Sequence, residues 1–207
     1  MTAWTYHPEL LATPVPRYTS YPTAAEFSEA VGRTDLEQAL ATVESDQPVS
    51  LYVHIPYCHE ICWYCGCNTG AANKAQRLQS YLDTLHAEIA LVAERLGGRG
   101  KVQRIAFGGG SPNAISPEQF ADLLCKLRAS FAADNALLSI ELDPRSLSGP
   151  WFEAIAAAGI HRASLGVQTL DPKVQRAIGR WQPQDLIEVA VAELRAAGVQ
   201  SLNFDLL

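Results

Sequence analysis

The sequence predicts an α/β fold built on a parallel sheet of about five strands. Three observations support this prediction. Short apolar runs alternate with longer segments in which apolar residues recur at helical spacing. Strands that alternate with helices form right-handed βαβ units, which make neighbouring strands parallel. Glycine-rich, cysteine-rich and polar motifs follow the ends of the strands, where parallel sheets bind their ligands.

The length and composition fit one globular domain with a substantial core. The chain has 207 residues, of which 48% are hydrophobic and 18% charged. Its net charge of −6 argues against a general nucleic-acid surface. No apolar run approaches the length of a membrane span, and residues 1–12 lack the basic and apolar regions of a signal peptide. We therefore expect a cytoplasmic protein without a membrane span that binds no nucleic acid.

Residues 1–48 are predicted to form an irregular N-terminal segment with one short helix. Four prolines prevent long regular helices in its first part: Pro8, Pro14, Pro16 and Pro22. Thr34 is the predicted N-cap of the short helix, and Glu37 completes a capping box three residues later. The apolar face of this helix is predicted from Leu36, Leu40 and Val43. Pro48 lies after its end.

Residues 49–207 are predicted to form one domain of alternating strands and helices. The strands are expected at residues 50–55, 102–107, 137–142, 162–167 and 201–206. A long helix contains the apolar residues from Leu78 to Leu96 and ends at Gly97. Ser116 begins the next helix as its N-cap, with Pro117 at the first helical position. Further helices are expected at residues 151–158, from 172 onward, and from 183 to about 198.

Four of the five cysteines lie within ten residues, directly after the first predicted strand: Cys58, Cys62, Cys65 and Cys67. The first three have the spacing Cys-x3-Cys-x2-Cys, which lets a short loop direct three thiolates to one point and suits a cubane iron–sulfur cluster. Such clusters are more often held by four thiolates, so three compact ligands leave open what occupies the fourth iron. If a substrate or a cofactor binds there, the site is catalytic.

Other interpretations of the cysteines remain open. A zinc site usually takes two well-separated ligand pairs, although His54 and His59 could complete a local site. Disulfides are less favoured, because cysteines this close together would close only tiny loops. An ordinary core cysteine fits only the isolated Cys125.

The cysteine motif, placed after the strand-like residues 51–56, resembles the signature of the radical S-adenosylmethionine (SAM) superfamily. With Cys67 included, Cys-x3-Cys-x2-Cys-x-Cys more narrowly resembles the oxygen-independent coproporphyrinogen III oxidases of haem biosynthesis. The related haem chaperones usually carry Phe at this last position. Further matches run nearly from end to end of the chain, at residues 16–22, 108–112, 140–145 and 166–168.

The resemblance implies a partial (βα) radical SAM barrel of about five parallel strands. It also implies a [4Fe–4S] cluster held by Cys58, Cys62 and Cys65, with SAM on the remaining iron. Contacts to this SAM are implied for Tyr52, the backbone of Tyr64, Gly109, Gly110, Ser111 and Glu141. Contacts to a second SAM are implied for Cys67, Gln168, Arg180 and Asp205. Arg17 is expected to pair with a substrate propionate as a bidentate donor.

Ordinary structural roles are the alternatives for these residues. Cys67 would then be a fourth cluster ligand or a small buried residue, and Tyr52 would pack in the barrel. Glu141 would be a carboxylate at the rim paired with Arg145. The glycines would form an ordinary loop, while Gln168, Arg180 and Asp205 would be surface or strand-end polar groups. At position 111 the family usually has Thr; Ser keeps the hydroxyl and loses one methyl group.

The implied activity is an oxidative decarboxylation. Two propionates of coproporphyrinogen III become vinyl groups, giving protoporphyrinogen IX, which makes this an oxidoreductase of anaerobic porphyrin biosynthesis. A flavodoxin- or ferredoxin-type electron donor and a monomeric state are expected. The alternatives are a related haem chaperone and an inactive remnant that binds a cluster. Family members are longer, so we expect a fragment that lacks a further strand and a C-terminal domain and whose full turnover is not assured.

Overall fold

The structure, a computed structural model, describes residues 26–67 and 69–207. The chain divides into two compact units, residues 1–39 and residues 40–207, and each is described by itself. Arg17, the predicted substrate-binding residue, lies outside the described residues.

The short helix α2 (Arg33–Ala41) forms in the region where the sequence predicts one. Its capping differs from the prediction, because Thr34 lies inside the helix and cannot be its N-cap. Asp35 in the first turn instead accepts a hydrogen bond from the backbone N–H of Gly32, at 2.8 Å. Glu37 accepts a hydrogen bond from Arg33 Nε at 2.9 Å. Asp35 therefore supplies the negative charge that favours a helix N-terminus.

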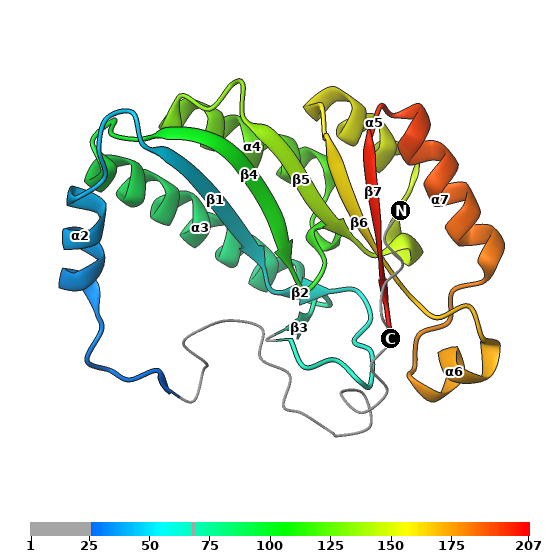
Figure 1. Ribbon diagram of the computed structural model, residues 1–207. Helices are drawn as coiled ribbons and strands as arrows, with labels where there is room; N and C mark the ends of the chain where they lie inside the picture. Colours follow the sequence, from blue (N-terminus) through cyan, green and yellow to red (C-terminus); the bar gives the residue numbers. More distant parts are fainter. Residues whose placement is uncertain (1–25, 68) are drawn as a thin grey trace, which may run out of the picture. The chain divides into compact units, whose positions relative to one another are not determined.

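Five parallel strands form one sheet in the unit of residues 40–207. They are β1 (Pro48–Ile55), β4 (Lys101–Gly109), β5 (Leu137–Leu142), β6 (Arg162–Gln168) and β7 (Ser201–Leu206). Their order is β1-β4-β5-β6-β7, and every neighbouring pair is parallel. All carboxyl ends therefore lie at one edge of the sheet, toward the lower part of Figure 1. This arrangement confirms the predicted five-stranded α/β fold.

Helices pack against one face of the sheet (Figure 1). They are α3 (Ala75–Leu96), α4 (Pro117–Phe131), α5 (Gly149–Ala158) and α7 (Gln184–Ala196). The capping box predicted for α4 is present: Ser116 Oγ accepts from the backbone N–H of Gln119, and Gln119 Oε1 accepts from the backbone N–H of Ser116. Helix α3 ends at Gly97 with φ of 60°, the left-handed conformation that glycine adopts without strain.

The core lies between the helices and the sheet. Along β5 every second side chain is buried, at Leu138, Ile140 and Leu142, because successive residues of a strand point to opposite faces. Phe120 of α4 packs edge-on against Phe107 of β4, with ring centroids 5.1 Å apart. The same ring lies 5.3 Å from that of Trp151 in α5. These aromatic contacts connect a strand with two helices.

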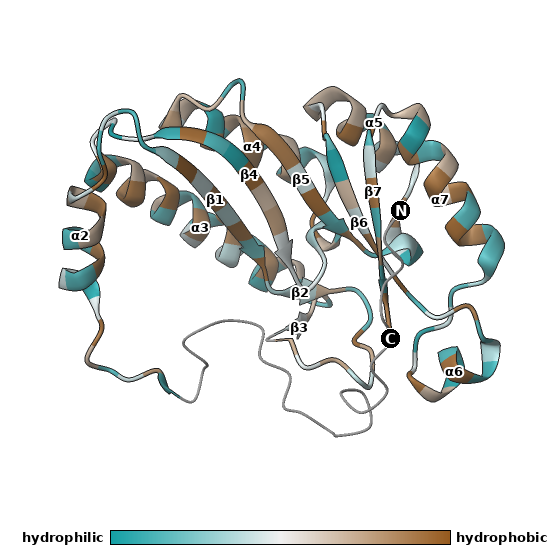
Figure 2. Ribbon diagram, in the orientation of Figure 1, coloured by the Kyte–Doolittle hydropathy of each residue, from teal (hydrophilic) through white to brown (hydrophobic). Residues whose placement is uncertain are grey.

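The opposite face of the sheet carries polar side chains. Glu141 of β5 is the register neighbour of Ser164 in β6, which in turn neighbours Asn203 of β7. Figure 2 shows hydrophobic and hydrophilic residues alternating along α7, as expected for a helix that covers the apolar face of the sheet. One face of the sheet therefore holds the core, and the other holds polar groups.

Short elements follow the carboxyl ends of four strands. They are β2 (Tyr57–Cys58) after β1, η2 (Pro112–Ala114) after β4, η3 (Pro144–Ser146) after β5 and α6 (Pro172–Ala177) after β6. A further strand, β3 (Gly70–Ala71), pairs with β2. No helix in the described part of the chain is both long and apolar enough to cross a membrane.

Candidate functional site

The cysteine motif begins in β2, directly after β1. Strands β2 and β3 close its base: the backbone N–H of Gly70 donates to the carbonyl of Pro56, and that of Ala72 donates to the carbonyl of Cys58, both at 2.8 Å. The backbone N–H of Cys65 donates to the carbonyl of Cys62 at 3.1 Å, which makes a tight turn inside the motif. The predicted cluster ligands therefore lie at the edge of the sheet where parallel strands bind ligands.

The four thiols of the motif differ in exposure. Cys62 is buried, Cys58 is half-buried, and Cys65 and Cys67 are exposed. Burial raises the pKa of the Cys58 thiol to about 11, and the charges of Cys65 and Cys62 add to this effect. Burial also raises the pKa of Cys67, with a further contribution from Cys65. The motif thus combines a buried thiol, Cys62, with exposed thiols at Cys65 and Cys67.

The opposite side of the motif is anchored on the segment that follows α6. The backbone N–H of Trp63 donates to the carbonyl of Ile178 at 3.0 Å. Gly179, with φ of 65°, lies against the Trp63 ring, and an added Cβ there would be only 2.8 Å from the ring carbons. The backbone of the motif is thus held from the β6 side as well as from β1.

A buried ion triad lies beside Cys62. Asp143 Oδ2 is 2.7 Å from Arg145 Nη2, and Asp143 Oδ1 is 3.1 Å from Arg180 Nη2. The three side chains are at most 10% exposed. Burial alone would raise the pKa of Asp143, but the hydrogen bonds from Arg145 and the charge of Arg180 hold it below its ordinary value. The carboxylate is therefore ionised between two guanidinium groups.

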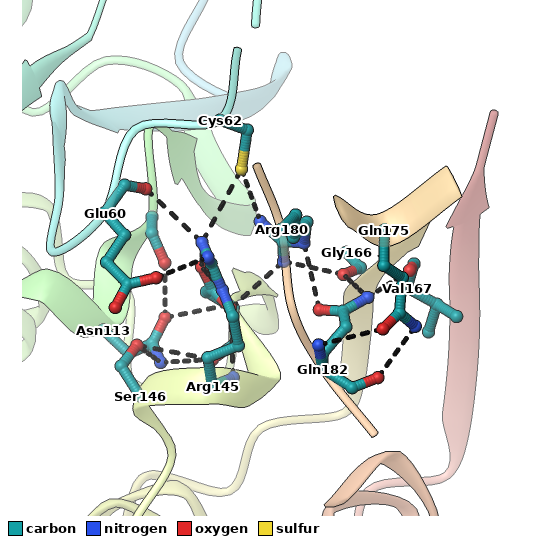
Figure 3. Close-up of polar contacts among 12 residues, drawn as sticks. Glu60, Cys62, Asn113, Arg145, Ser146, Gly166, Val167, Gln175, Arg180 and Gln182 are labelled. Carbon is teal, nitrogen blue, oxygen red and sulfur yellow. Dashed lines mark hydrogen bonds and ion pairs between the residues drawn. The ribbon is translucent and has the colours of Figure 1, made fainter. Parts of the chain in front are cut away.

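Both arginines of the triad also reach the Cys62 sulfur. Arg180 Nη1 lies 3.3 Å from Cys62 Sγ, and Arg145 Nη2 lies 3.6 Å from it (Figure 3). Arg145 pairs in addition with the exposed carboxylate of Glu60, at 2.7 Å. The alternative in which Arg145 pairs with Glu141 is therefore wrong, because its described ion pairs are with Asp143 and Glu60.

Arg180 is fixed by a set of buried amides. Its Nη2 donates to the carbonyl of Gly166 at 2.7 Å, and its Nε donates to Gln182 Oε1 at 3.0 Å. Gln182 is fully buried, and its amide nitrogen donates to the carbonyls of Gly166 and Val167 at the end of β6. The side-chain amide of Gln175 holds Gln182 in turn: Gln175 Oε1 accepts from the backbone N–H of Gln182, and Gln175 Nε2 donates to the carbonyl of Gln182. The guanidinium thus connects the Cys62 sulfur with the carboxyl end of β6.

The three glycines after Phe107 leave room for close approaches. A Cβ on Gly108 would lie 2.8 Å from Glu141 Oε2 and from Tyr52 Oη. A Cβ on Gly110 would lie 2.7 Å from the carbonyl oxygen of Tyr57. Gly109 has φ of 118°, a conformation that other residues rarely adopt. Glycine is therefore needed at Gly109 for its backbone conformation and at Gly110 for the close backbone, whereas the neighbours of Gly108 are side-chain ends that can move.

The hydroxyl of Ser111 is buried and already paired. It donates to Asn113 Oδ1 at 2.6 Å, and the same Oδ1 accepts the backbone N–H of Asp143 at 3.0 Å. Asn113 Nδ2 donates to the carbonyl of Asp143 and to Ser146 Oγ. Asn113 therefore joins the end of β4 to the end of β5 and positions the backbone of the ion triad.

The predicted contacts to the first SAM lie next to these glycines. Glu141 Oε2 accepts a hydrogen bond from the backbone N–H of Gly109 at 3.3 Å, and burial raises the pKa of Glu141. Tyr52 is 60% exposed, with its hydroxyl 3.4 Å from His54 Nδ1. Burial raises the pKa of Tyr64 to about 12. The carboxylate of Glu141 and the phenol of Tyr52 thus lie on sheet strands beside the glycines, whereas Tyr64 belongs to the cysteine motif itself.

Four residues are predicted to contact a second SAM. Gln168 ends β6 and Asp205 lies on β7, whereas Cys67 and Arg180 lie outside the strands. Gln168 has φ of 64°, a rare value for a side-chain-bearing residue, and it follows a register shift at the end of β6. Asp205 accepts hydrogen bonds from Ser164 Oγ at 3.2 Å and from Asn203 Nδ2 at 3.0 Å. These contacts place Asp205 on the polar face, two strands away from Glu141.

A family model described as the radical SAM superfamily matches residues 52–207. The chain belongs to the radical SAM superfamily. The matched part includes the cysteine motif and every strand that carries a predicted site residue. The predicted family is confirmed.

Several relatives within the superfamily are similar to this chain. The oxygen-independent coproporphyrinogen III oxidase of Bradyrhizobium diazoefficiens is 45% identical over 194 residues, which cover 93% of this chain and 43% of the relative. The corresponding protein of Escherichia coli is 40% identical over 193 residues, covering 93% and 42%. A solved structure of coproporphyrinogen III oxidase from Escherichia coli, described as a radical SAM enzyme, matches with a TM-score of 0.87 at 37% identity, covering 98% of this chain and 45% of that one.

These matches confirm the partial radical SAM barrel predicted from the sequence. They also show that the chain spans less than half the length of the relatives it matches.

Membership of the radical SAM superfamily implies a [4Fe–4S] cluster and SAM. The donor set fits a cluster, because the three thiols of Cys-x3-Cys-x2-Cys come from one loop and two guanidinium groups lie beside Cys62. Within residues 26–67 and 69–207, however, no three His, Cys, Asp or Glu side chains are already arranged to hold a metal ion. The ligand assignment stays a prediction.

Sequence reasoning missed three buried polar residues of the site, namely Asn113, Gln182 and Arg145 in its contact with Cys62. Asn113 directly follows the Gly-Gly-Gly-Ser-Pro motif, and Arg145 ends the Ile-Glu-Leu-Asp-Pro-Arg motif, so both could have been found as polar members of recognised segments. Gln182 has no sequence signal, since its burial depends on the folding of the chain after α6 back onto β6.

Proposed function

We propose that this chain is the cofactor-binding part of an oxygen-independent coproporphyrinogen III oxidase. In this proposal, residues 49–207 form the radical SAM domain and residues 1–48 an N-terminal segment. The substrate is coproporphyrinogen III, two propionates of which are oxidatively decarboxylated to vinyl groups. The observation that carries the proposal is the position of the four-cysteine motif at the carboxyl edge of the sheet, beside the glycines of β4. The names of relatives at 36–45% identity support the choice of substrate.

Cys58, Cys62 and Cys65 are the proposed ligands of a [4Fe–4S] cluster. When bound, such a cluster supplies one electron for the cleavage of SAM, which provides the radical that removes a hydrogen atom from the substrate. The protein contributes the environment. Cys62 is buried next to two positive charges, whereas Cys65 faces solvent. This asymmetry leaves one side of the motif open for a cofactor.

The first SAM is proposed to bind along the carboxyl ends of β1, β4 and β5. Gly109 and Gly110 lack side chains, so the backbone can approach the methionyl group closely. Glu141 and Tyr52 lie beside them, and the Glu141 carboxylate can accept hydrogen bonds from ribose hydroxyls. Ser111 supports the turn through Asn113, and the backbone of Tyr64 supplies a further contact.

A second SAM is proposed to contact Cys67, Gln168, Arg180 and Asp205. Gln168 and Asp205 lie at the carboxyl ends of the neighbouring strands β6 and β7, and Cys67 is exposed at the end of the cysteine motif. Arg17 is proposed to pair with a propionate. A flavodoxin- or ferredoxin-type protein is the proposed electron donor, and the chain is proposed to act as a monomer.

Anaerobic reconstitution tests this proposal in separate steps. The purified chain is incubated with iron and sulfide, and its metal content and visible spectrum are measured. SAM cleavage to 5′-deoxyadenosine is then followed under dithionite, and CO2 release is followed with coproporphyrinogen III. We expect Cys62→Ala to abolish cluster uptake and Cys125→Ala to leave it unchanged, because Cys125 lies in α4 outside the motif.

Each step of this experiment can contradict a different part of the proposal. A wild-type chain that takes up no iron would overturn the cluster assignment. SAM cleavage without CO2 release would retain the cofactor site and reject coproporphyrinogen III as the substrate of this chain. Binding of haem without SAM cleavage would favour the related haem chaperones.

A further inference from the structure

The ion triad beside Cys62 carries a buried surplus of positive charge. Arg145 and Arg180 contribute two positive charges and Asp143 contributes one negative charge, so the three buried side chains sum to +1. Glu60 pairs with Arg145 as well, at 2.7 Å, but its side chain is 72% exposed, and ion pairs with such exposed carboxylates contribute little. Because buried charges are costly unless they are paired, this arrangement calls for a further anionic partner.

The Cys62 sulfur is the acceptor toward which this charge is directed. Guanidinium nitrogens of Arg180 and Arg145 reach it, at 3.3 and 3.6 Å. A neutral thiol is a weak acceptor, whereas a thiolate bound to a metal keeps its negative charge. Figure 3 shows both guanidinium groups in contact with the Cys62 sulfur. Their charge therefore complements a ligated Cys62 better than a free one.

We propose that Arg145 and Arg180, which both pair with Asp143, donate hydrogen bonds to the Cys62 sulfur when Cys62 binds the cluster. These hydrogen bonds and charges raise the reduction potential of the cluster. This inference rests on the proposed [4Fe–4S] site. Reduction adds one negative charge to the cluster, which nearby positive charges stabilise, and hydrogen bonds to cluster sulfurs act in the same direction. The effect is large on the buried side of the motif, where water does not screen it.

Asp143 and the amides around it are the positioning residues of this device. Asp143 makes two hydrogen bonds with Arg145 Nε and one with its Nη2, which fixes the plane of that guanidinium. Gln182 and the carbonyl of Gly166 fix the plane of the Arg180 guanidinium in the same way. Neither arginine needs to be reordered when the cluster binds, so the hydrogen bonds to sulfur cost little conformational entropy.

A redox titration of the reconstituted chain, followed by electron paramagnetic resonance, tests the inference. Arg145 is the residue to change, since Arg180 is also proposed to contact SAM. We expect Arg145→Met to lower the ratio of reduced to oxidised cluster at a fixed potential by about tenfold, equivalent to about 59 mV for a one-electron couple. The matched control is Arg162→Met, which removes an exposed arginine from the amino end of β6.

A spectroscopic readout separates hydrogen bonding from a general structural effect. We expect the iron–sulfur stretching bands in the resonance Raman spectrum to shift in Arg145→Met and to remain in place in Arg162→Met. Arg145→Lys keeps the charge without the planar donor, so its potential should lie between those of the wild type and Arg145→Met. This variant also decides the question if Arg145→Met does not fold.

The outcomes separate this inference from the proposed function. A wild-type chain without a cluster contradicts the proposed function. A cluster with the same potential and the same Raman bands in wild type, Arg145→Met and Arg145→Lys would overturn the inference while leaving the proposed function intact. If neither Arg145 variant took up a cluster while Arg162→Met did, Arg145 would be assigned to folding the motif and its role in setting the potential would be rejected.

Discussion

At the scale of single residues, Gly110 lies against the backbone of Tyr57 and leaves no room for a side chain. A Cβ on Gly110 would lie 2.7 Å from the Tyr57 oxygen, and backbone atoms cannot yield as the end of a side chain can. We expect Gly110→Ala to lower the free energy of unfolding by about 1–3 kcal/mol and to weaken SAM binding, because β2 must move. Urea denaturation and equilibrium dialysis with SAM measure the two effects.

Gly149→Ala is the matched control for this change. Nothing lies within 4 Å of a Cβ at Gly149, the first residue of α5. Alanine there should leave SAM binding unchanged and stabilise the helix by up to about 1 kcal/mol. Equal losses of SAM binding in the two variants would show that the close approach at Gly110 has no special role.

The ionisation of Cys58 is a second residue-scale property. Burial raises the pKa of this thiol from 9.0 to about 11, with Cys65 adding to the effect. The folded-state pKa of Cys58 lies above the unfolded value. Burial of the neutral Cys58 thiol therefore contributes fully to stability below pH 9, and this contribution is lost as the pH rises from 9 to about 11, because the thiol then ionises more readily in the unfolded chain. In the metal-free chain, alkylation of Cys58 should therefore be slow at neutral pH and rise about tenfold per pH unit.

Mass spectrometry of peptides labelled with iodoacetamide measures this rise. In the folded chain the labelling rate of Cys58 should level off only near pH 11, whereas in urea it should level off near the ordinary value of 9.0. A plateau at the same pH in both states would mean that the fold does not bury this thiol.

At the scale of elements, helix α4 shows how local sequence sets a boundary. Ser116 and Gln119 exchange hydrogen bonds at its first turn, with distances of 2.9 and 3.2 Å. We expect Ser116→Ala to destabilise the protein by about 1 kcal/mol, because a donor of the first turn loses its acceptor. Chemical denaturation measures the change. In contrast, Ser130→Ala near the other end of α4 should be neutral or slightly stabilising, since alanine has the higher helix propensity.

The connections between elements matter as much as their boundaries. The cysteine motif is tied to β3 by backbone hydrogen bonds and to the segment after α6 through Trp63. The ion triad ties it to η3 and β6. Loops held from several sides keep their side chains in place, which is what a site that orients a reactive cofactor requires.

At the scale of the whole molecule, the five strands differ in how many neighbours they have. The central strand β5 pairs with β4 and β6, whereas β7 lies at the end of the described sheet and pairs with β6. Phe204 and Leu206 of β7 are exposed, while alternate residues of β5 are completely covered. Edge strands open at lower free-energy cost than central ones.

Hydrogen exchange should therefore distinguish the two strands. We expect backbone amides of β7 to exchange before those of β5, because β5 opens only when both of its neighbours separate. Exchange followed by mass spectrometry or NMR on the intact chain measures the order. Equal protection of the two strands would mean that the sheet opens as one unit.

Much of this architecture could be predicted from residue patterns. The alternation of apolar residues fixed the five strands within a few residues, and Ser116, Gly97 and Gly159 marked helix ends by rules that depend on one turn of chain. The predicted cap of α2 was wrong. Both Thr34 and Asp35 have side chains that can accept a hydrogen bond from a free backbone N–H, and which of them does so depends on where the helix starts.

The sequence by itself determined the fold class, because periodicity is a property of neighbouring residues, and it determined the family through the resemblance of the motif Cys58–Cys67 and the further motifs. Only the tertiary structure decided that Arg145 and Arg180 meet at Cys62, with Asp143 between them. Cys62 and Arg180 are 118 positions apart, and no local pattern encodes their contact. Their meeting results from parallel strands that deliver their carboxyl ends to one edge of the sheet, where distant segments must share the same buried space.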